Sequence, residues 1–226
     1  MKLLVKTDKP IKHLTSRDIR NFIASISSDN ADEILWHKGG NLPRLVFTKP
    51  YDCAFEIISY SNNEDLINSI ANNLQNKNIR IDKADANIIS TIVGYEELIF
   101  EKLTKPITYV SRTPMILSAN PVEYKIVYAT NKYNKKDLFR YIIEKTKKDI
   151  QYKMKYYKKI DVSKEVENLQ IDIKNAQLRL VEYKPYEKKK QAAYLTFESN
   201  YALPRFIGYK MGLGWGEIIQ KVTELN

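Results

Sequence analysis

Apolar residues in the first half of the chain alternate between the spacing of strands and the spacing of helices, and this alternation constrains the fold most strongly. Residues 1–7 form a short apolar strand, and 15–26 form a helix. That helix starts with a capping-box spacing and continues with apolar residues at i, i+3, i+4 and i+7, namely Ile19, Phe22, Ile23 and Ile26. Strands over 44–48 and 53–60, a helix over 62–75 and a β-rich segment over 78–94 follow. The resulting order, β-α-β-β-α-β, is that of the ferredoxin-like fold.

The second half has a comparable order. Its longest helix, over 137–157, carries an apolar stripe of Leu138, Phe139, Ile142, Ile143, Ile150, Met154 and Tyr157. We expect strands on both sides of this helix, over 107–118, 122–129, 169–183, 191–198 and 217–222. A short helix is expected over 201–209. The sequence therefore predicts an α+β protein of two tandem ferredoxin-like (βαββαβ) units, over 1–104 and 105–226.

Glycine is concentrated near the C-terminal end of the sequence. Four of the seven glycines, Gly208, Gly212, Gly214 and Gly216, lie within nine residues around one lysine, Lys210. Glycine permits positive φ and close approach of another backbone or a ligand. The cluster has neither the context of a dinucleotide-binding fingerprint nor the Gly-Lys-Ser/Thr of a Walker loop. A glycine-rich loop with a central lysine suits the backbone of a nucleic acid.

The charge of the chain is distributed unevenly. Residues 1–104 carry 13 Lys and Arg against 14 Asp and Glu, whereas residues 105–226 carry 24 against 13, so the net charge of +10 arises in the second half. A polyanion is drawn to such a region by counterion release. Codon bias toward lysine is an alternative explanation of the charge, but it explains the asymmetry poorly. The lack of a long apolar run predicts no membrane span, and the single cysteine excludes a disulfide framework, so we expect a cytoplasmic protein.

Near the C-terminal end, an apolar helix expected at 203–209 is followed by a glycine-rich stretch at 210–214 and by Gly214-Trp215-Gly216 ahead of an apolar strand. In this order the segment resembles that of the repeat-associated (RAMP) superfamily of CRISPR proteins, and in particular the CRISPR repeat-processing endoribonucleases. Residues 109–114 also resemble the Thr-Pro strand that opens the second half of those proteins. That family usually has more than one basic residue in the loop, whereas this chain has only Lys210 there.

The resemblance implies an endoribonuclease that cleaves CRISPR precursor RNA without a metal or cofactor, leaving a 2′,3′-cyclic phosphate and a 5′-hydroxyl. It implies that His37 is the general acid or base, with Lys38 and Arg44 stabilising the charged transition state. The RNA-binding residues it implies are Arg112, Arg205, Gly208, Lys210, Gly212, Gly214 and Gly216. CRISPR repeat RNA is the expected partner; effector-complex subunits and a homodimer are left open, and no membrane partner is expected.

Alternatives remain for each of these residues. His37 can be a loop histidine without a chemical role, and His13 is the reserve base. The carboxylate pairs Asp32-Glu33 and Asp82/Asp85 are interpreted as solvated, so no metal site is expected. The segment 132–159 carries 11 Lys and Arg, which suits a solvated helix face as well as an RNA contact. A non-catalytic RNA-binding subunit of a CRISPR effector complex is the alternative function, and a ferredoxin-like RNA-binding protein unrelated to CRISPR is a third.

Overall fold

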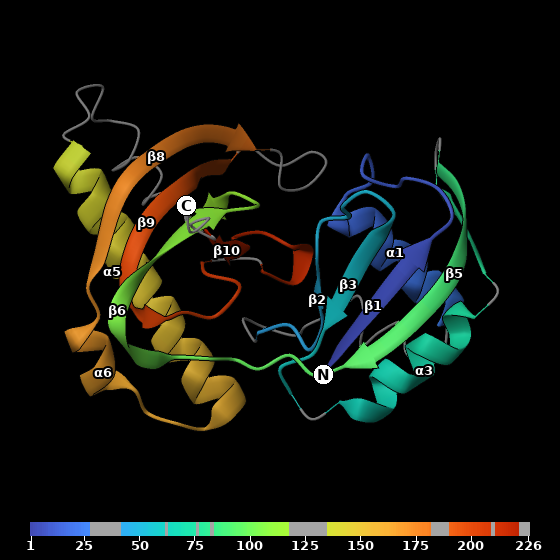
Figure 1. The fold of residues 1–226 in the computed structure, drawn as a ribbon, viewed down its shortest axis with the longest axis horizontal. Coiled ribbons are helices and arrows are strands. Elements are labelled where there is room, and N and C mark those ends of the chain that lie inside the picture. The colour runs from blue at the N-terminus through green and yellow to red at the C-terminus, as the bar shows by residue number, and fades with distance from the viewer. Residues whose placement is uncertain are drawn as a thin grey trace, which may run out of the picture. The chain divides into compact units, whose positions relative to one another are not determined.

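Helices and two antiparallel five-stranded sheets make up the fold, as seen in a computed structural model (Figure 1). The structure describes residues 1–27, 42–61, 63–75, 77–81, 84–117, 135–181, 190–208 and 211–221. These residues form two compact units: Met1–Glu97 with Gly212–Gly214, and Leu98–Met211 with Trp215–Asn226. None of the helices in these ranges is long and apolar enough to cross a membrane.

The first unit contains the helix and strand order expected from the sequence, with one additional strand. Its elements are β1 (Lys2–Thr7), α1 (Ser16–Ile26), β2 (Val46–Phe47), β3 (Ala54–Ile58), α3 (Glu64–Leu74), β4 (Asn78–Ile81) and β5 (Ala84–Gly94). The sheet order is β2-β3-β1-β5-β4. The β-rich segment expected over 78–94 is thus two strands, β4 and β5, that pair with each other.

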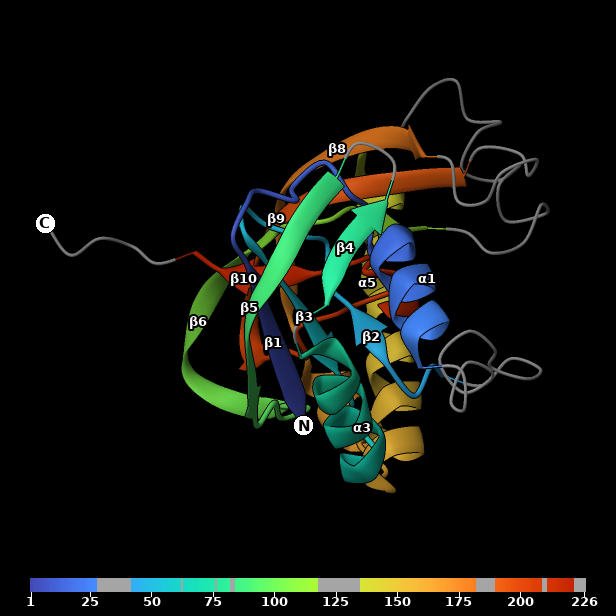
Figure 2. The ribbon, with the colours of Figure 1, turned by 90° about the vertical axis from the view of Figure 1, so that its right-hand side faces the viewer.

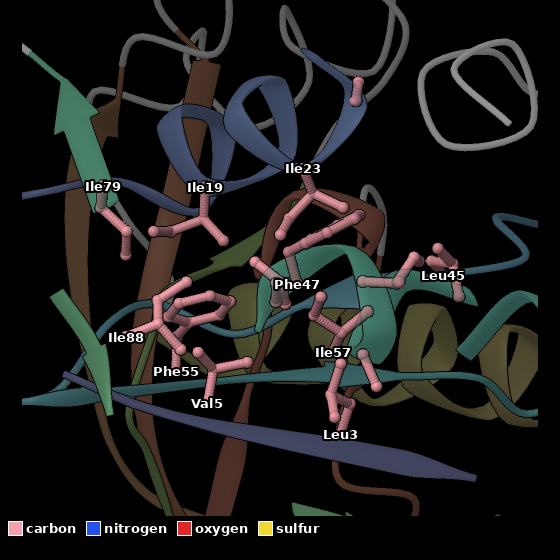
Figure 3. Packing of buried hydrophobic residues seen from close by; sticks show 14 of the residues in the cluster. Leu3, Val5, Ile19, Ile23, Leu45, Phe47, Phe55, Ile57, Ile79 and Ile88 are labelled. Atoms are coloured by element: carbon pink, nitrogen blue, oxygen red, sulfur yellow. The ribbon is translucent and has the colours of Figure 1, made fainter. Parts of the chain in front are cut away.

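Helix α1 begins where the sequence signal predicts. The N–H of Asp18 donates to Oγ1 of Thr15 at 3.2 Å, and the N–H of Thr15 donates to Oδ2 of Asp18 at 2.7 Å, which completes the capping box. Figure 2 shows α1 and α3 next to each other on one face of the sheet. Their inward residues pack against that face in a core that includes Ile19, Ile23, Phe47, Phe55 and Ile67 (Figure 3).

The second unit combines long strands with one long helix. Its elements are β6 (Glu101–Ser111), β7 (Met115–Ile116), α5 (Lys135–Lys153), η2 (Met154–Lys158), α6 (Ser163–Asn168), β8 (Ile171–Val181), β9 (Lys190–Ala202) and β10 (Ile218–Gln220). The short helix η3 (Met211–Leu213) spans the residues at which the chain passes from the second unit to the first. The sheet order is β10-β6-β9-β7, and β8 also pairs with β9. The long helix expected over 137–157 is α5 followed by a π-helix, η2.

Two features of the second unit differ from the expectation. The prediction of a helix over 201–209 is wrong, because β9 continues to Ala202 and Phe206 forms an isolated β-bridge with Glu217. The buried Leu203, Phe206 and Ile207 have helical spacing, but strand pairing with distant residues determines their conformation. The short helix α6 was not anticipated from the sequence, and the strand expected over 122–129 lies outside the described residues.

Candidate functional site

Three segments that are distant in the sequence meet in the first unit around Gly212 and Gly214. A Cβ atom on Gly212 would lie 2.8 Å from Cβ of Pro43, and the backbone oxygen of Leu45 is also close to that position. A Cβ on Gly214, whose φ is +71°, would overlap Oγ of Ser16 and lie 2.6 Å from the backbone oxygen of Phe47. Both glycines are therefore needed for close packing, Gly214 against the start of α1 and the end of β2, and Gly212 against the residues that precede β2.

Arg44 and His13 belong to the segments that these glycines contact. Arg44 is exposed and stands between Pro43 and Leu45, the two residues nearest to Gly212. His13 is exposed in the turn before α1, three residues ahead of Ser16, and this turn is closed by a hydrogen bond from the N–H of Leu14 to the oxygen of Ile11 at 2.9 Å. An exposed guanidinium such as that of Arg44 can bind a phosphate through two parallel N–H···O hydrogen bonds.

Several predicted residues lie outside the described part of the chain. These are the candidate catalytic residues His37 and Lys38 and the loop lysine Lys210. Their roles stay predictions. Of the three candidate catalytic residues, Arg44 alone falls within the described residues, and its chain neighbours Pro43 and Leu45 lie against Gly212.

The second unit leaves no room for a side chain at Gly208, which faces the side chain of Met115, or at Gly216, which faces the backbone of Ile207. Both have positive φ, +85° and +75°, which L-residues rarely adopt. A Cβ on Gly216 would overlap the backbone oxygen of Ile207, and one on Gly208 would lie 2.6 Å from Cγ of Met115. The N–H of Ile207 donates to the oxygen of Gly216 at 2.9 Å, and the N–H of Gly216 donates to the oxygen of Pro114 at 3.1 Å. These two glycines have a structural reason that is independent of any ligand.

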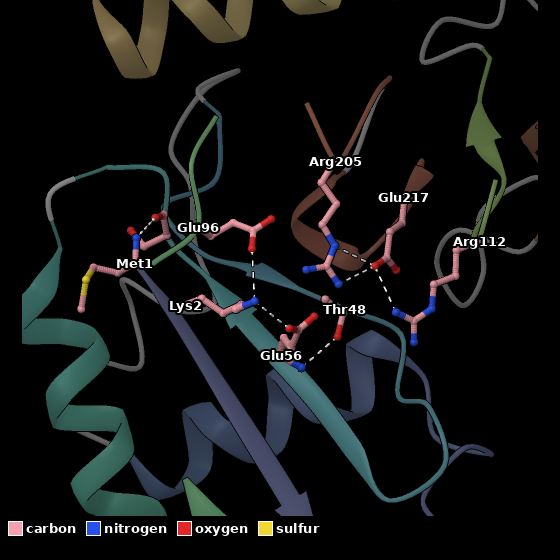
Figure 4. Close-up of polar contacts among 9 residues, drawn as sticks. Met1, Lys2, Thr48, Glu56, Glu96, Arg112, Arg205 and Glu217 are labelled. Atoms are coloured by element: carbon pink, nitrogen blue, oxygen red, sulfur yellow. Dashed lines mark hydrogen bonds and ion pairs between the residues drawn. The ribbon is translucent and has the colours of Figure 1, made fainter. Parts of the chain in front are cut away.

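The two arginines predicted to contact RNA converge on one buried carboxylate (Figure 4). Nε and Nη2 of Arg205 donate to Oε1 of Glu217 at 3.0 and 2.7 Å, and Nη1 of Arg112 donates to the same oxygen at 3.2 Å. The side chain of Glu217 is fully buried, whereas those of Arg112 and Arg205 are 24% and 19% exposed. Charge-assisted bonds of this kind hold both guanidinium groups in place.

A second buried ion pair holds the chain where it enters the glycine cluster. Nζ of Lys153, fully buried, donates to Oδ2 of Asp149 at 2.6 Å and to the oxygen of Phe206 at 2.8 Å. The N–H of Gly208 donates to the same Asp149 oxygen at 2.8 Å. Burial raises the pKa of Asp149 and lowers the pKa of Lys153, and the attraction between the two charges opposes both shifts. The pair therefore fixes residues 206–208 from one face of α5.

Carboxylates in the described residues do not gather into a metal site. No group of three or more His, Cys, Asp or Glu residues within these ranges is arranged to hold a metal ion. Glu56 in β3 and Glu96, two residues after β5, both pair with Nζ of Lys2, at 3.3 and 3.4 Å (Figure 4). Asp85 is exposed and lies 3.9 Å from Arg80, as expected for a solvated carboxylate. Asp32, Glu33 and Asp82 lie outside the described residues.

Sequence reasoning missed Glu217, Asp149 and Lys153. The sequence does contain a signal for Asp149 and Lys153. The apolar stripe of α5 that contains Ile142 and Ile150 also passes through positions 149 and 153. An Asp and a Lys spaced i, i+4 therefore lie on the buried face of the helix. Glu217 had no comparable signal, because a charged residue beside glycines is usually exposed.

Solved structures of Cas6 and RAMP proteins have the same fold. A Cas6b crystal structure aligns over 98% of this chain and 100% of its own, with a TM-score of 0.69 and 18% identity. A RAMP protein described as binding different RNA substrates aligns over 98% and 100%, with a TM-score of 0.62 and 15% identity. A Cas6-related protein from Pyrococcus furiosus aligns over 100% and 99%, with a TM-score of 0.60 and 11% identity.

The resemblance seen in the sequence is therefore confirmed at the level of the fold: this chain has the fold of the Cas6 and RAMP proteins along its full length. No protein-family profile and no characterised protein matches the sequence itself.

Proposed function

We propose that this protein is a metal-independent endoribonuclease that cleaves CRISPR precursor RNA within its repeats. The observation that carries the proposal is the full-length fold likeness to Cas6b structures, one of which is described as a CRISPR RNA processing endoribonuclease. The excess of positive charge in the second half suits a polyanionic partner. In this proposal both units are ferredoxin-like, and residues 208–216 are the glycine-rich loop that contacts the RNA.

The proposed chemistry is attack of the RNA 2′-hydroxyl on the adjacent phosphorus. The 2′-oxygen loses its proton to a base, a P–O bond forms, and the bond to the 5′-oxygen breaks as that oxygen gains a proton. The products are a 2′,3′-cyclic phosphate and a 5′-hydroxyl. His37 is the general acid or base in this proposal, and Lys38 and Arg44 stabilise the charge that develops on the phosphorane. The exposed position of Arg44 next to Gly212 supports its part.

RNA binding is assigned to the glycine-rich loop and to residues of the second unit. Lys210 supplies a cation within the loop, and Gly212 and Gly214, which are buried against Pro43 and Ser16, shape the loop. Arg112 and Arg205 are held by Glu217 while part of each side chain stays exposed, so each can meet a phosphate without first losing side-chain freedom. Their ion pairs support a preorganised cationic surface.

Single-turnover cleavage of a repeat RNA by histidine variants tests the catalytic assignment. We expect His37→Ala to lower the rate about 100-fold or more, the usual scale for loss of general acid–base catalysis, with RNA affinity largely unchanged. His13→Ala is the matched control and is expected to stay near the wild-type rate. Cleavage by His37→Ala at near the wild-type rate contradicts the assignment, and a large loss in His13→Ala instead moves the role to the turn before α1.

A non-catalytic RNA-binding subunit of a CRISPR effector complex is the second candidate. The likeness to a RAMP protein described as binding different RNA substrates favours it. Such a protein would bind the repeat RNA and leave it intact under every condition in which the variants above are compared.

A further inference from the structure

The C-terminal end of the long helix in the second unit has an unusual backbone and an unusual surface. After Lys153 the helix continues over Met154–Lys158 as a π-helix and stops at Lys159, whose φ of +60° is left-handed. The N–H of Lys159 caps the helix by donating to the oxygen of Met154. Single π-turns are rare and occur frequently at functional sites.

Tyrosine rings lie next to one another over this turn. Tyr152 is 45% exposed, and its ring centroid lies 6.2 Å from that of Tyr156, with a 40° angle between the ring planes. Tyr157 meets Tyr156 edge-on at 5.1 Å. Nζ of Lys159 lies 5.3 Å from the centroid of Tyr156 and donates to the backbone oxygen of the same residue at 2.8 Å. Contacts with neighbours thus hold Tyr156 in place, and the neighbouring Tyr152 exposes aromatic surface to solvent.

Exposed lysines flank these tyrosines in the sequence, and residues 148–159 contain no exposed carboxylate. Lys148, Lys155, Lys158 and Lys159 are all exposed. The only carboxylate in the sequence from 148 to 159 is Asp149, which is paired with buried Lys153. The next one, Asp161, is exposed, accepts hydrogen bonds from the backbone N–H and side chain of Ser163, and lies near enough to Lys155 for the two charges to attract each other. Lys148 and Lys155 are separated by about 10 Å along the helix axis, from the rise of about 1.5 Å per residue.

We propose that this surface, formed by Lys148, Tyr152, Lys155, Tyr156, Lys158 and Lys159, binds single-stranded RNA. A base stacks on Tyr152, and the lysines meet the phosphates on either side, which is the usual combination in proteins that bind unpaired strands. An acidic protein would bind the lysines but has no base to stack on the exposed ring of Tyr152, so the aromatic surface favours a nucleic acid. For the origin of the RNA the inference rests on the proposed function: the strand is an unpaired part of the repeat transcript.

Binding of a labelled oligouridine of 12 nucleotides, measured by fluorescence anisotropy, tests this proposal without requiring cleavage. We expect Tyr152→Ala to weaken the affinity by about tenfold or more and Tyr152→Phe to retain it, since stacking requires the ring and not the hydroxyl. The matched control is Tyr95→Ala, which removes a tyrosine that is 87% exposed in the first unit. Equal affinity of Tyr152→Ala and wild type overturns the stacking role.

The salt dependence of the same binding tests the lysines. Replacing Lys148 and Lys155 together by Gln is expected to lower the slope of log Kd against log salt concentration by about 1.4, for two phosphate contacts to a single strand. Replacing the exposed Lys102 and Lys105 by Gln gives a variant of equal net charge, whose slope we expect to stay near that of the wild type. Equal slopes for the two double variants overturn the proposal. Polyglutamate, an acidic polymer without bases, is added as a competitor in the same assay. If it displaces the RNA and binds Tyr152→Ala as tightly as it binds the wild type, the proposal is also overturned.

Failure of the proposed function and failure of this RNA-binding surface give different results. If the wild-type protein leaves repeat RNA intact but binds oligouridine in a way that depends on Tyr152, the surface stands and the endoribonuclease assignment falls. If repeat RNA is cleaved and oligouridine binding does not depend on Tyr152, the endoribonuclease stands and this surface falls.

Discussion

Replacing Gly216 with alanine tests whether the glycine cluster is fixed by the backbone of the protein. Gly216 has a φ of +75°, and its oxygen accepts a hydrogen bond from the N–H of Ile207 at 2.9 Å. A Cβ atom at this position would overlap the oxygen of that same Ile207. The segments that contain Ile207 and Gly216 must therefore move apart or change conformation to accept even the smallest side chain.

The expected cost follows from two contributions. A left-handed conformation costs an L-residue about 1–2 kcal/mol. Separation of Gly216 from Ile207 also breaks a backbone hydrogen bond and leaves buried polar groups unpaired, which costs about 1–3 kcal/mol. We therefore expect Gly216→Ala to lower the free energy of unfolding by about 2–5 kcal/mol, the sum of those two ranges.

Gly94 provides the matched control. It lies in β5, no atom is within 4 Å of the position its Cβ would take, and its φ is not positive. Gly94→Ala is therefore expected to be neutral or to stabilise by up to about 1 kcal/mol, because alanine restricts the unfolded chain. Urea unfolding followed by tryptophan fluorescence, with Trp215 adjacent to the site, measures both variants. A Gly216→Ala variant within about 1 kcal/mol of wild type would refute the backbone argument.

Three further predictions concern polar groups. Glu217→Gln is expected to lower the free energy of unfolding, measured in urea, by about 2–4 kcal/mol, because two partly buried guanidinium groups lose their counter-charge. Glu198→Gln, which breaks an exposed ion pair, is the control and is expected to stay within about 1 kcal/mol of the wild type. The pKa of Asp8 is lowered from its usual 3.8, chiefly by the hydrogen bond from the Asn87 side chain, so its contribution to stability is present above pH 3.8 and is lost as the pH falls through the lowered pKa. Asp8→Asn should accordingly lower the thermal midpoint of unfolding at pH 7, and the difference from the wild type should disappear in strong acid. Thr15→Ala removes the N-cap of α1 and is expected to cost about 1 kcal/mol by urea unfolding; an unchanged midpoint would mean that the cap contributes nothing.

Local signals explain which parts of the fold could be predicted. Helix α1 was predicted because Thr15 and Asp18 form a capping box and because Ile19 and Ile23 lie on one face, and the structure confirms both. Helix α3 follows similarly from Leu66, Ile67, Ile70 and Leu74, all buried. In both cases the residues that determine the element lie within the element itself.

Long-range contacts explain the parts that could not be predicted. Residues 203–207 have helical spacing, but Phe206 pairs with Glu217, so the segment is not a helix. Arg112 and Arg205 were predicted as RNA contacts from charge and resemblance, and nothing in the sequence indicated that Glu217 binds both. The nearness of Gly212 to Pro43 is also invisible in the sequence, because about 170 residues separate them.

The central claim is that the protein cuts repeat RNA through the 2′-hydroxyl of the RNA itself. The most direct measurement incubates wild-type protein in EDTA with a repeat RNA and with the same RNA carrying a single 2′-deoxy substitution at the scissile nucleotide. We predict cleavage of the first RNA to a 2′,3′-cyclic phosphate and a 5′-hydroxyl, and binding of the second RNA without cleavage. Equal cleavage of both RNAs, or binding of both without cleavage, would contradict the proposed function.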